Sequence, residues 1–139
     1  MKTLLFAEEN SSDEVSEEVL NDSIYRNFLN AVSVGIWVSD KEGQVKFFNK
    51  SWLLYTGRTL ENELSHKWRG EEIHPDDRHS CLNTYKTKFK TVSAFEHEYR
   101  LLRHDAEFRC IREYVKPSFG KDNTHTGFVG TCIDITDIR

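Results

Sequence analysis

The stretch that decides the fold is residues 98–136, EYRLLRHDAEFRCIREYVKPSFGKDNTHTGFVGTCIDIT. Three segments in and beside it are rich in aromatic and β-branched residues: Phe95–Leu102, Phe108–Val115 and Phe128–Ile135. Polar clusters separate these segments, which is the pattern of antiparallel strands joined by hairpins. The sequence therefore predicts three consecutive strands of one sheet.

The two joints between these strands differ. A tight turn at His104–Glu107 requires a left-handed residue, so Ala106 in place of glycine should cost about 1 kcal/mol. The second joint, residues 116–126, contains Pro117, Gly120 and an Asp-Asn pair. We expect it to be a longer, mobile loop.

The segment Asp134-Ile135-Thr136-Asp137 follows the last predicted strand. It places a hydroxyl group that can cap backbone N–H groups before an acidic side chain, and this is how helices begin. We therefore expect residues 138–139 to start a linker helix that is cut short, and the chain to be an input module of a larger protein.

Size and composition limit the possible functions. The chain has 139 residues, of which 37% are hydrophobic and 30% charged, and this suits one soluble domain with a single core. The net charge of -4 is uneven, since residues 1–22 carry -6 and the remainder +2. A nearly neutral core offers no basic groove, so nucleic-acid binding is not expected.

The cysteines and the apolar segments indicate the compartment. Cys81, Cys110 and Cys132 form no Cys-x-x-Cys pair and are odd in number, so neither a disulfide framework nor a zinc site is indicated. No apolar run is long enough to span a bilayer or to act as a secretory signal. We expect a cytoplasmic protein without membrane contact.

The N-terminal third contains one helix and one hairpin. Residues 1–21 are acidic and form either a linker or part of a flanking helix. An amphipathic helix is predicted from Asp22 to Ala31, since its apolar residues recur at helical spacing. Strands at Gly35–Ser39 and Gln44–Phe48 flank a turn that ends in glycine.

Helices fill the middle of the chain. A short one is expected at Lys50–Tyr55, with Asn49 as its N-cap and Gly57 as its left-handed terminator. Another is expected from Thr59 to Leu64, followed by an irregular turn over Trp68–Ile73. The longest helix should begin at Pro75 and reach residue 90, with Asp76 and Asp77 in its first turn and an apolar stripe formed by Leu82, Tyr85 and Phe89.

The order of these elements predicts an α+β domain over residues 22–137, with a five-stranded antiparallel sheet, short helices packed on one face and an N-terminal flanking helix. Particular residues then become recognisable within this order. They are Trp37-Val38-Ser39-Asp40, Asn49-Lys50-Ser51-Trp52, Tyr55-Thr56-Gly57, Trp68, Ile73-His74-Pro75-Asp76-Asp77, Glu98-Tyr99-Arg100, Asp105, Phe108-Arg109, Val129-Gly130 and Asp134-Ile135-Thr136.

Together these residues resemble a PAS domain of the subgroup common in bacterial sensor histidine kinases and diguanylate cyclases. Two positions depart from the pattern: Ala106 replaces the usual glycine, and Cys110 stands where many members have tryptophan. The resemblance implies a sensory and protein-interaction module with a ligand cavity and without catalysis of its own. It also implies that Asp134, Ile135 and Thr136 relay a signal to an output kinase or cyclase in the same polypeptide, and that the flanking helices form a homodimer.

Four residues combine a polar group with an apolar setting and are our candidates for a ligand pocket: Tyr55, Trp68, Tyr85 and His97. For His97, a hydrogen-bonded place in the core is the alternative to a pocket-lining one. The cofactor is unknown. The flavin-binding PAS subgroup carries a cysteine where this chain has Glu63–Trp68, so flavin photochemistry is not expected.

Histidines raise the question of a metal or haem. His74 precedes Pro75 at a helix start, which favours a capping role over metal binding. His79 is the haem-ligand candidate, because PAS haem sensors supply their ligand from the corresponding helix. Helical projection, however, places Arg78 nearer than His79 to the centre of the apolar stripe.

No enzymatic motif is present, and adjacent Asp76 and Asp77 point about 100° apart on a helix, so they do not form a facing carboxylate pair. The sequence favours a signal-relay PAS domain that binds a small molecule or a partner. Two alternatives remain: a ligand-free dimerisation module, and a haem-dependent gas or redox sensor.

Overall fold

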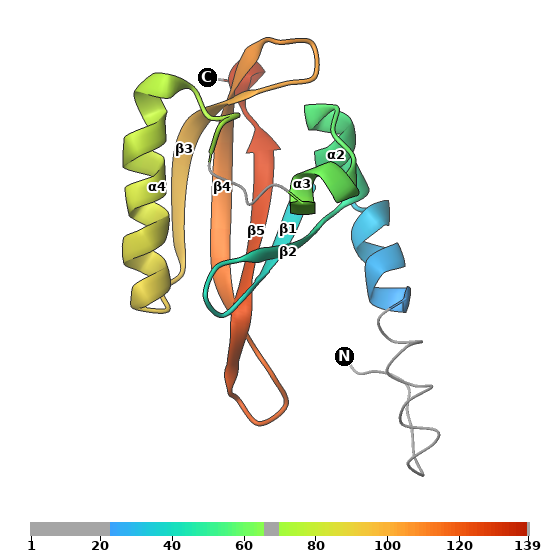
Figure 1. The fold of residues 1–139 in the computed structure, drawn as a ribbon, viewed down its shortest axis with the longest axis vertical. Coiled ribbons are helices and arrows are strands. Elements are labelled where there is room, and N and C mark those ends of the chain that lie inside the picture. Colours follow the sequence, from blue (N-terminus) through green and yellow to red (C-terminus); the bar gives the residue numbers. More distant parts are fainter. Residues whose placement is uncertain (1–22, 66–69, 139) are drawn as a thin grey trace.

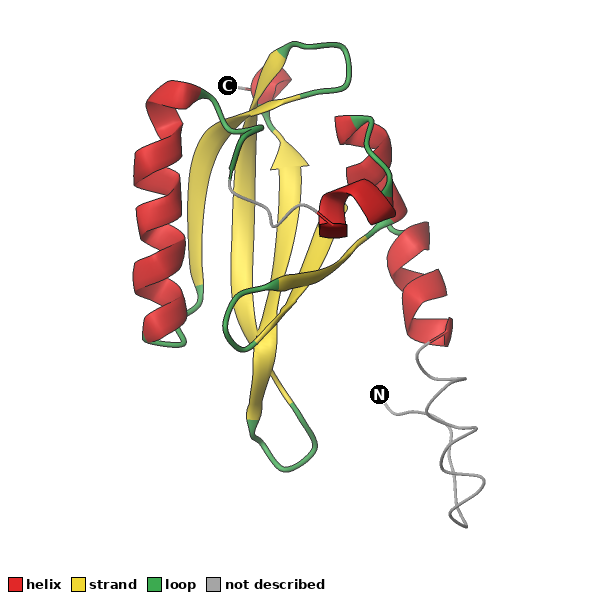
Figure 2. Ribbon diagram, viewed as in Figure 1, coloured by secondary structure: helices red, strands yellow, loops and turns green. Residues whose placement is uncertain are grey.

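The computed structural model describes residues 23–65 and 70–138. Its centre is one antiparallel sheet with the strand order β2-β1-β5-β4-β3 (Figures 1 and 2). The strands are β1 (Gly35–Asp40), β2 (Val45–Phe48), β3 (Phe95–Leu102), β4 (Phe108–Phe119) and β5 (His125–Asp134). The predicted α+β class with five antiparallel strands is confirmed.

Helices α2 (Lys50–Thr56), α3 (Leu60–Ser65) and α4 (Pro75–Lys90) connect β2 to β3. In Figure 1, α4 runs alongside β3, whereas α2 and α3 lie at the β1 and β2 end of the sheet. The main core lies between these helices and the sheet. It contains Trp52 of α2 and Tyr85 of α4, together with Phe128 of β5.

Asn49 explains why α2 begins where it does. Its side chain is fully buried, and its Oδ1 accepts hydrogen bonds from Trp52 N at 3.1 Å and Ile36 N at 2.8 Å. The side-chain amide donates to the carbonyl oxygens of Leu29 and Val34. One residue therefore caps the helix and ties it to β1, and the predicted cap is confirmed. Gly57 ends α2 with φ 77°, as predicted.

The start of α4 also follows the sequence. His74 is its N-cap, and His74 Nδ1 accepts a hydrogen bond from Asp76 N at 3.1 Å. The Asp77 carboxylate binds the Arg100 guanidinium and its backbone N–H, which fastens the helix to β3. The capping role predicted for His74 is therefore confirmed.

The last turn of the helix over residues 23–31 contacts β1 and β2 on the face opposite the main core. Leu29 is buried there against Ile36 and Phe47. Ile24, Tyr25 and Phe28 remain 52%, 53% and 65% exposed. The predicted start at residue 22, the acidic segment 1–21 and residue 139 lie outside the described residues.

The hairpin between β4 and β5 differs from the expectation. A loop was expected over residues 116–126, but β4 continues to Phe119 and β5 begins at His125, so only residues 120–124 connect them. Pro117 is tolerated because β3 begins at Phe95, opposite Val115, so within the described residues Pro117 pairs only with Phe128 of β5. It therefore lies on a stretch of β4 without a second neighbour, where a missing N–H group is acceptable.

The other hairpin turn is as predicted. Ala106 has φ 67°, in the left-handed region, while Arg103 N donates to Glu107 O at 2.9 Å and closes the turn. The irregular turn expected over 68–73 falls partly outside the described residues. Its end is a turn in which Ile73 N donates to Gly70 O.

Candidate functional site

A cavity of about 180 Å³ lies between the sheet and helices α2 and α4. Five aromatic residues line it: Trp37, Phe48, Trp52, Tyr85 and Phe89. Phe48 and Trp52 stack with ring centroids 5.2 Å apart, and Trp37 meets Tyr85 edge to face at 6.3 Å. The carboxylate of Glu113, on β4, is the charged group of this lining.

Glu113 is fully buried, and side chains from four elements donate hydrogen bonds to it. Its Oε1 accepts from the Tyr85 hydroxyl and from His97 Nε2, the latter at 2.7 Å. Its Oε2 accepts from Trp37 Nε1 at 2.6 Å and from the Cys132 thiol at 3.1 Å. Each carboxylate oxygen therefore already accepts two hydrogen bonds.

These hydrogen bonds decide the charge of the site. Burial of the Glu113 carboxyl opposes ionisation, but the hydrogen bonds from His97, Tyr85 and Trp37 outweigh it and keep its pKa below the usual value. Burial, together with the nearby carboxylate, raises the pKa values of the Tyr85 phenol and the Cys132 thiol. The site is thus an anionic carboxylate surrounded by neutral donors and one imidazole.

The strands position this carboxylate. Ile111, Glu113 and Val115 alternate along β4 and are all buried, so a glutamate occupies a core position of the strand. Gly130 on β5 makes room for the Trp37 indole, because a Cβ there would lie 2.1 Å from a ring atom. The sequence analysis did not identify Glu113. The sequence pattern that could have identified it is a glutamate that alternates with the apolar residues Ile111 and Val115 on one side of a predicted strand.

A second cavity of about 130 Å³ lies nearer the end of β5. Trp52 lines both cavities, while Tyr55 and Asp134 line only the second. Trp52 and Tyr55 are both on α2. This short helix therefore forms a wall of the first cavity and contacts the end of β5 in the second.

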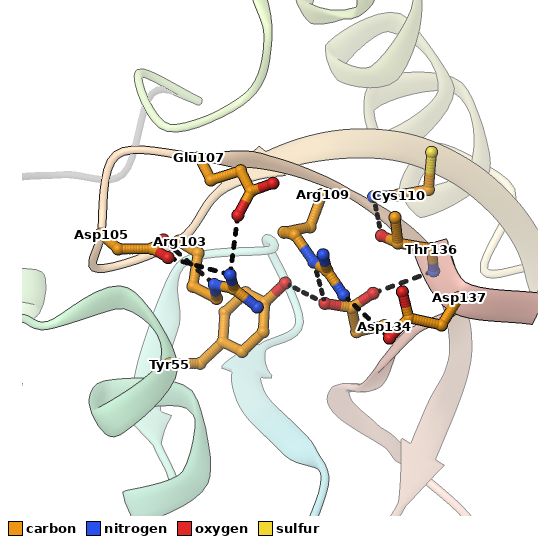
Figure 3. Close-up of polar contacts among 9 residues, drawn as sticks. All are labelled: Tyr55, Arg103, Asp105, Glu107, Arg109, Cys110, Asp134, Thr136 and Asp137. Carbon is orange, nitrogen blue, oxygen red and sulfur yellow. Dashed lines mark hydrogen bonds and ion pairs between the residues drawn. The ribbon is translucent and has the colours of Figure 1, made fainter.

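At the end of β5, Asp134 joins three parts of the chain (Figure 3). Its Oδ2 accepts from the Tyr55 hydroxyl at 2.7 Å and from Arg109 Nε at 2.9 Å, and its Oδ1 accepts from Thr136 N at 2.9 Å. Partial burial opposes ionisation of Asp134, but these donors hold its pKa well below the usual value. Burial and the bond to Asp134 raise the pKa of Tyr55.

The chain after β5 forms a 3₁₀ helix, η1 (Thr136–Ile138). The sequence predicted that the Thr136 hydroxyl would cap this turn, and that assignment is wrong. The Thr136 hydroxyl instead accepts from Cys110 N at 2.8 Å, whereas the carboxylate of Asp134 caps the turn (Figure 3). Ile135 N donates to Cys110 O, so Cys110 holds the segment by both of its backbone groups.

The four pocket candidates fall in different places. Tyr85 lines the first cavity and Tyr55 the second. His97 lines neither cavity, but it is hydrogen-bonded to Glu113, which lines the first one. This agrees with the alternative prediction for His97, a hydrogen-bonded place in the core. Trp68 lies outside the described residues.

The haem-ligand candidate is poorly placed. The His79 side chain is exposed and lines neither cavity, whereas Arg78 is partly buried and donates to the Ile73 carbonyl at 3.0 Å. Within residues 23–65 and 70–138, no group of three or more metal-ligating side chains is arranged to hold an ion. Burial raises the pKa of the Cys81 thiol to about 12, and this thiol packs in the main core.

No helix in the described part of the chain is long and apolar enough to cross a membrane.

Two curated relatives match most of the chain. An uncharacterised protein, y4lL, of Sinorhizobium fredii (strain NBRC 101917 / NGR234) is 30% identical over 119 residues, which cover 86% of this chain and 14% of that protein. The peroxide stress-activated histidine kinase mak1 of Schizosaccharomyces pombe (strain 972 / ATCC 24843) is 28% identical over 110 residues, or 78% of this chain and 7% of that kinase. The chain thus spans only a small part of either relative.

Among solved structures, the N-terminal domain of a diguanylate cyclase with PAS/PAC sensor from Marinobacter aquaeolei superposes with a TM-score of 0.60. It is 18% identical, and the match covers 74% of this chain and 95% of that domain. The family model described as the PAS fold matches residues 23–135. From this match and the five-stranded sheet, the chain belongs to the PAS family of sensory domains.

Proposed function

We propose that this PAS domain senses a small molecule in the aromatic cavity and relays its presence to the segment that follows β5. The observation that carries the proposal is the double role of α2. Its Trp52 forms part of the cavity wall, and one turn later its Tyr55 donates a hydrogen bond to Asp134. A ligand that shifts α2 therefore changes the environment of Asp134.

The relay needs two states with different affinities for the ligand. We propose that the two states differ in the conformation of the joint Asp134-Ile135-Thr136. In this structure, hydrogen bonds from Tyr55 and Arg109 fix the carboxylate that caps η1. When α2 moves, the Tyr55 bond lengthens, Asp134 reorients and the cap on Thr136 N weakens. The start of the following helix is then free to change direction.

The output of such a relay belongs to the protein of which this domain is part. We propose a bacterial histidine kinase or a cyclic-dinucleotide enzyme, with the catalytic domain following in the same polypeptide and the PAS domain in the cytoplasm. The histidine kinase among the relatives, a yeast protein, supports the kinase class, and the three free cysteines suit a reducing compartment.

The proposal is tested by titrating the protein with benzene, an apolar probe that suits a cavity of this size, and recording nuclear magnetic resonance spectra. The Trp37 and Trp52 indole signals and the Thr136 amide signal should shift together. In Tyr55→Phe the indole signals should still shift while the Thr136 signal stays in place. Tyr114→Phe, on the exposed side of β4, is the matched control and should behave as the wild type.

Native mass spectrometry of the purified protein complements this titration by detecting a co-purified small molecule. If neither a co-purified molecule nor any shift of the indole signals is found, the sensing proposal is wrong. If the Thr136 signal still shifts in Tyr55→Phe, the relay does not pass through α2.

A second function is favoured by the helix over residues 23–31. We propose that it also forms a homodimer, because Ile24, Tyr25 and Phe28 are more than half exposed on one short helix. Analytical ultracentrifugation should show a dimer that Phe28→Glu converts to monomer, with Asn27→Glu as the control of equal charge. A monomeric wild type, or a dimer in Phe28→Glu, would contradict this interface.

A further inference from the structure

The cavity holds a negative charge whose nitrogen partners are the His97 imidazole and the Trp37 indole rather than an arginine or a lysine. Glu113 is fully buried, and three of its four hydrogen-bond donors are the neutral groups of Trp37, Tyr85 and Cys132. The fourth donor is the His97 imidazole. Throughout residues 23–65 and 70–138, no lysine or arginine nitrogen forms an ion pair with this carboxylate. The electric field of the Glu113 carboxylate therefore acts on a molecule that enters the cavity. The field is strong there because the surroundings are apolar.

The walls that face this charge are aromatic. Phe48 and Trp52 form a stacked pair on one side, and Trp37, Tyr85 and Phe89 form a second cluster beside Glu113. The faces of aromatic rings attract cations, most strongly where water is excluded. An aromatic lining alone accepts any apolar molecule, but an aromatic lining with a buried carboxylate favours an organic cation.

The hydrogen bonds narrow the class of cation further. Both oxygens of Glu113 already accept two hydrogen bonds, which uses their four acceptor positions. The other side-chain acceptor in the lining is the Tyr85 hydroxyl, and its hydrogen-bond partners are Glu113, Cys81 and Tyr99. An ammonium ion that brings N–H groups would leave donors unpaired in an apolar cavity, which is costly.

From these three observations we propose that the cavity binds a small quaternary ammonium cation, whose charge needs no hydrogen bond. This inference rests on the proposed function, because it names the ligand class for the same cavity. The volume of about 180 Å³ suits a trimethylammonium group with a short substituent, since a cavity of about 150 Å³ holds benzene. The ligand lies between the Phe48–Trp52 pair and the Glu113 carboxylate and keeps a distance from its saturated oxygens.

The experiment compares, on the wild-type protein, three probes that share a hydroxyethyl group. Choline carries the quaternary group, its uncharged carbon isostere has a tert-butyl group in place of the trimethylammonium group, and ethanolamine carries a primary ammonium. Binding is followed by the indole N–H signals of Trp37 and Trp52 and by calorimetry. Choline should bind about tenfold or more tightly than the isostere, and ethanolamine should bind more weakly than choline.

A pair of variants assigns the preference to Glu113. Glu113→Gln keeps the shape and removes the charge, so the ratio between choline and isostere should fall towards one. Glu96→Gln removes the same charge from an exposed position on β3 and should leave the ratio unchanged. Because Glu113→Gln could fail to fold, the comparison of probes on the wild type decides the question alone.

The outcomes separate this inference from the proposed function. If the isostere binds as tightly as choline, the inference is overturned while the cavity still takes small molecules. If ethanolamine binds as tightly as choline, the saturated acceptors do not select against N–H groups and the quaternary class is wrong. If benzene and all three probes fail to bind, the sensing function fails as well.

Discussion

Glu113 and Asp134 are carboxylates on neighbouring strands, and they are stabilised in opposite ways. The β4–β5 register pairs Glu113 with Cys132 and Ile111 with Asp134, so both side chains lie on the same face of the sheet. Glu113 is fully buried and surrounded by neutral donors and one imidazole, whereas Asp134 is 21% exposed and paired with Arg109. The charge of Asp134 is therefore paired with a guanidinium, whereas that of Glu113, beside the His97 imidazole, is the one that we propose acts on a ligand.

The two carboxylates also differ in which parts of the molecule hold them in position. The four donors to Glu113 come from β1, α4, β3 and β5, so its position depends on the packing of the whole core. The donors to Asp134 are Tyr55 and Arg109 and a backbone group of its own segment. A change around Glu113 therefore alters the cavity, whereas a change around Asp134 affects the direction of the chain after β5.

The comparison predicts unequal losses of stability. Glu113→Ala leaves several buried donors without an acceptor and should lower the free energy of unfolding by about 3 to 5 kcal/mol. Asp134→Ala should cost about 1 to 2 kcal/mol, because Arg109 can turn to Asp137, which lies 3.5 Å away, or to solvent. Urea unfolding measures both.

Glu107→Ala is a suitable control, since its carboxylate is 57% exposed and its ion pair with Arg103 contributes little. Its effect should stay within about 0.5 kcal/mol. Equal losses for Glu113→Ala and Asp134→Ala, or a reversed order, would show that burial does not distinguish the two carboxylates.

Acid should weaken the fold through both groups. Each carboxyl has a lower pKa in the folded protein than its ordinary value of 3.8 for Asp134 or 4.5 for Glu113, so the folded state binds the proton less readily than the unfolded chain. Their contribution is complete above these ordinary values and is lost as the pH falls below them. Stability should therefore decline as the pH is lowered from about 5 to 2.

Asp134→Asn removes one of these titrating groups, and it should make the decline shallower while stability near neutral pH drops by about 1 kcal/mol. Urea midpoints measured at several pH values test this. A decline as steep as that of the wild type would mean that the Asp134 cluster does not contribute to acid sensitivity.

The fold could be predicted because its signals are local. Alternating apolar residues marked the strands, Asn49 and Gly57 marked the ends of α2, and Pro75 followed by two aspartates marked the start of α4. The extension of β4 through Pro117 could not be predicted, because it depends on where β3 begins. That is a property of the sheet rather than of the segment.

The candidate site was less accessible to sequence analysis. Tyr85 was predicted because an aromatic side chain with a polar group on an apolar stripe is a local pattern. Glu113 was missed because a charged residue in a strand is normally assigned to the solvent side, and its four donors come from elements distant in sequence. The sequence analysis also missed that Asp134, and not Thr136, caps η1. The reason is the same, because the Thr136 hydroxyl is engaged by Cys110 N on β4, which is distant in sequence.

The smallest expected effect lies in the turn that joins β3 and β4, the strand that carries Glu113 and Arg109. Ala106 has φ 67°, and an L-residue there costs about 1 to 2 kcal/mol relative to glycine. Glycine also gives the unfolded chain more freedom, which costs about 0.4 to 1 kcal/mol. Because relief of the backbone strain outweighs this loss, Ala106→Gly should stabilise the protein by about 0.5 kcal/mol or slightly more.

The matched control is Ala94→Gly, just before β3, because Ala94 is not in the left-handed region and only the added freedom of the unfolded chain matters there. It should destabilise the protein by about 0.4 to 1 kcal/mol, so the two alanines should change stability in opposite directions. Thermal and urea unfolding resolve this difference in sign. Since no hydrogen bond or ion pair in the described part of the chain joins residues 103–107 to either carboxylate, Ala106→Gly should leave the difference between Glu113→Ala and Asp134→Ala unchanged when it is combined with either. A shift in that difference would mean that the hairpin couples the two sites through β4.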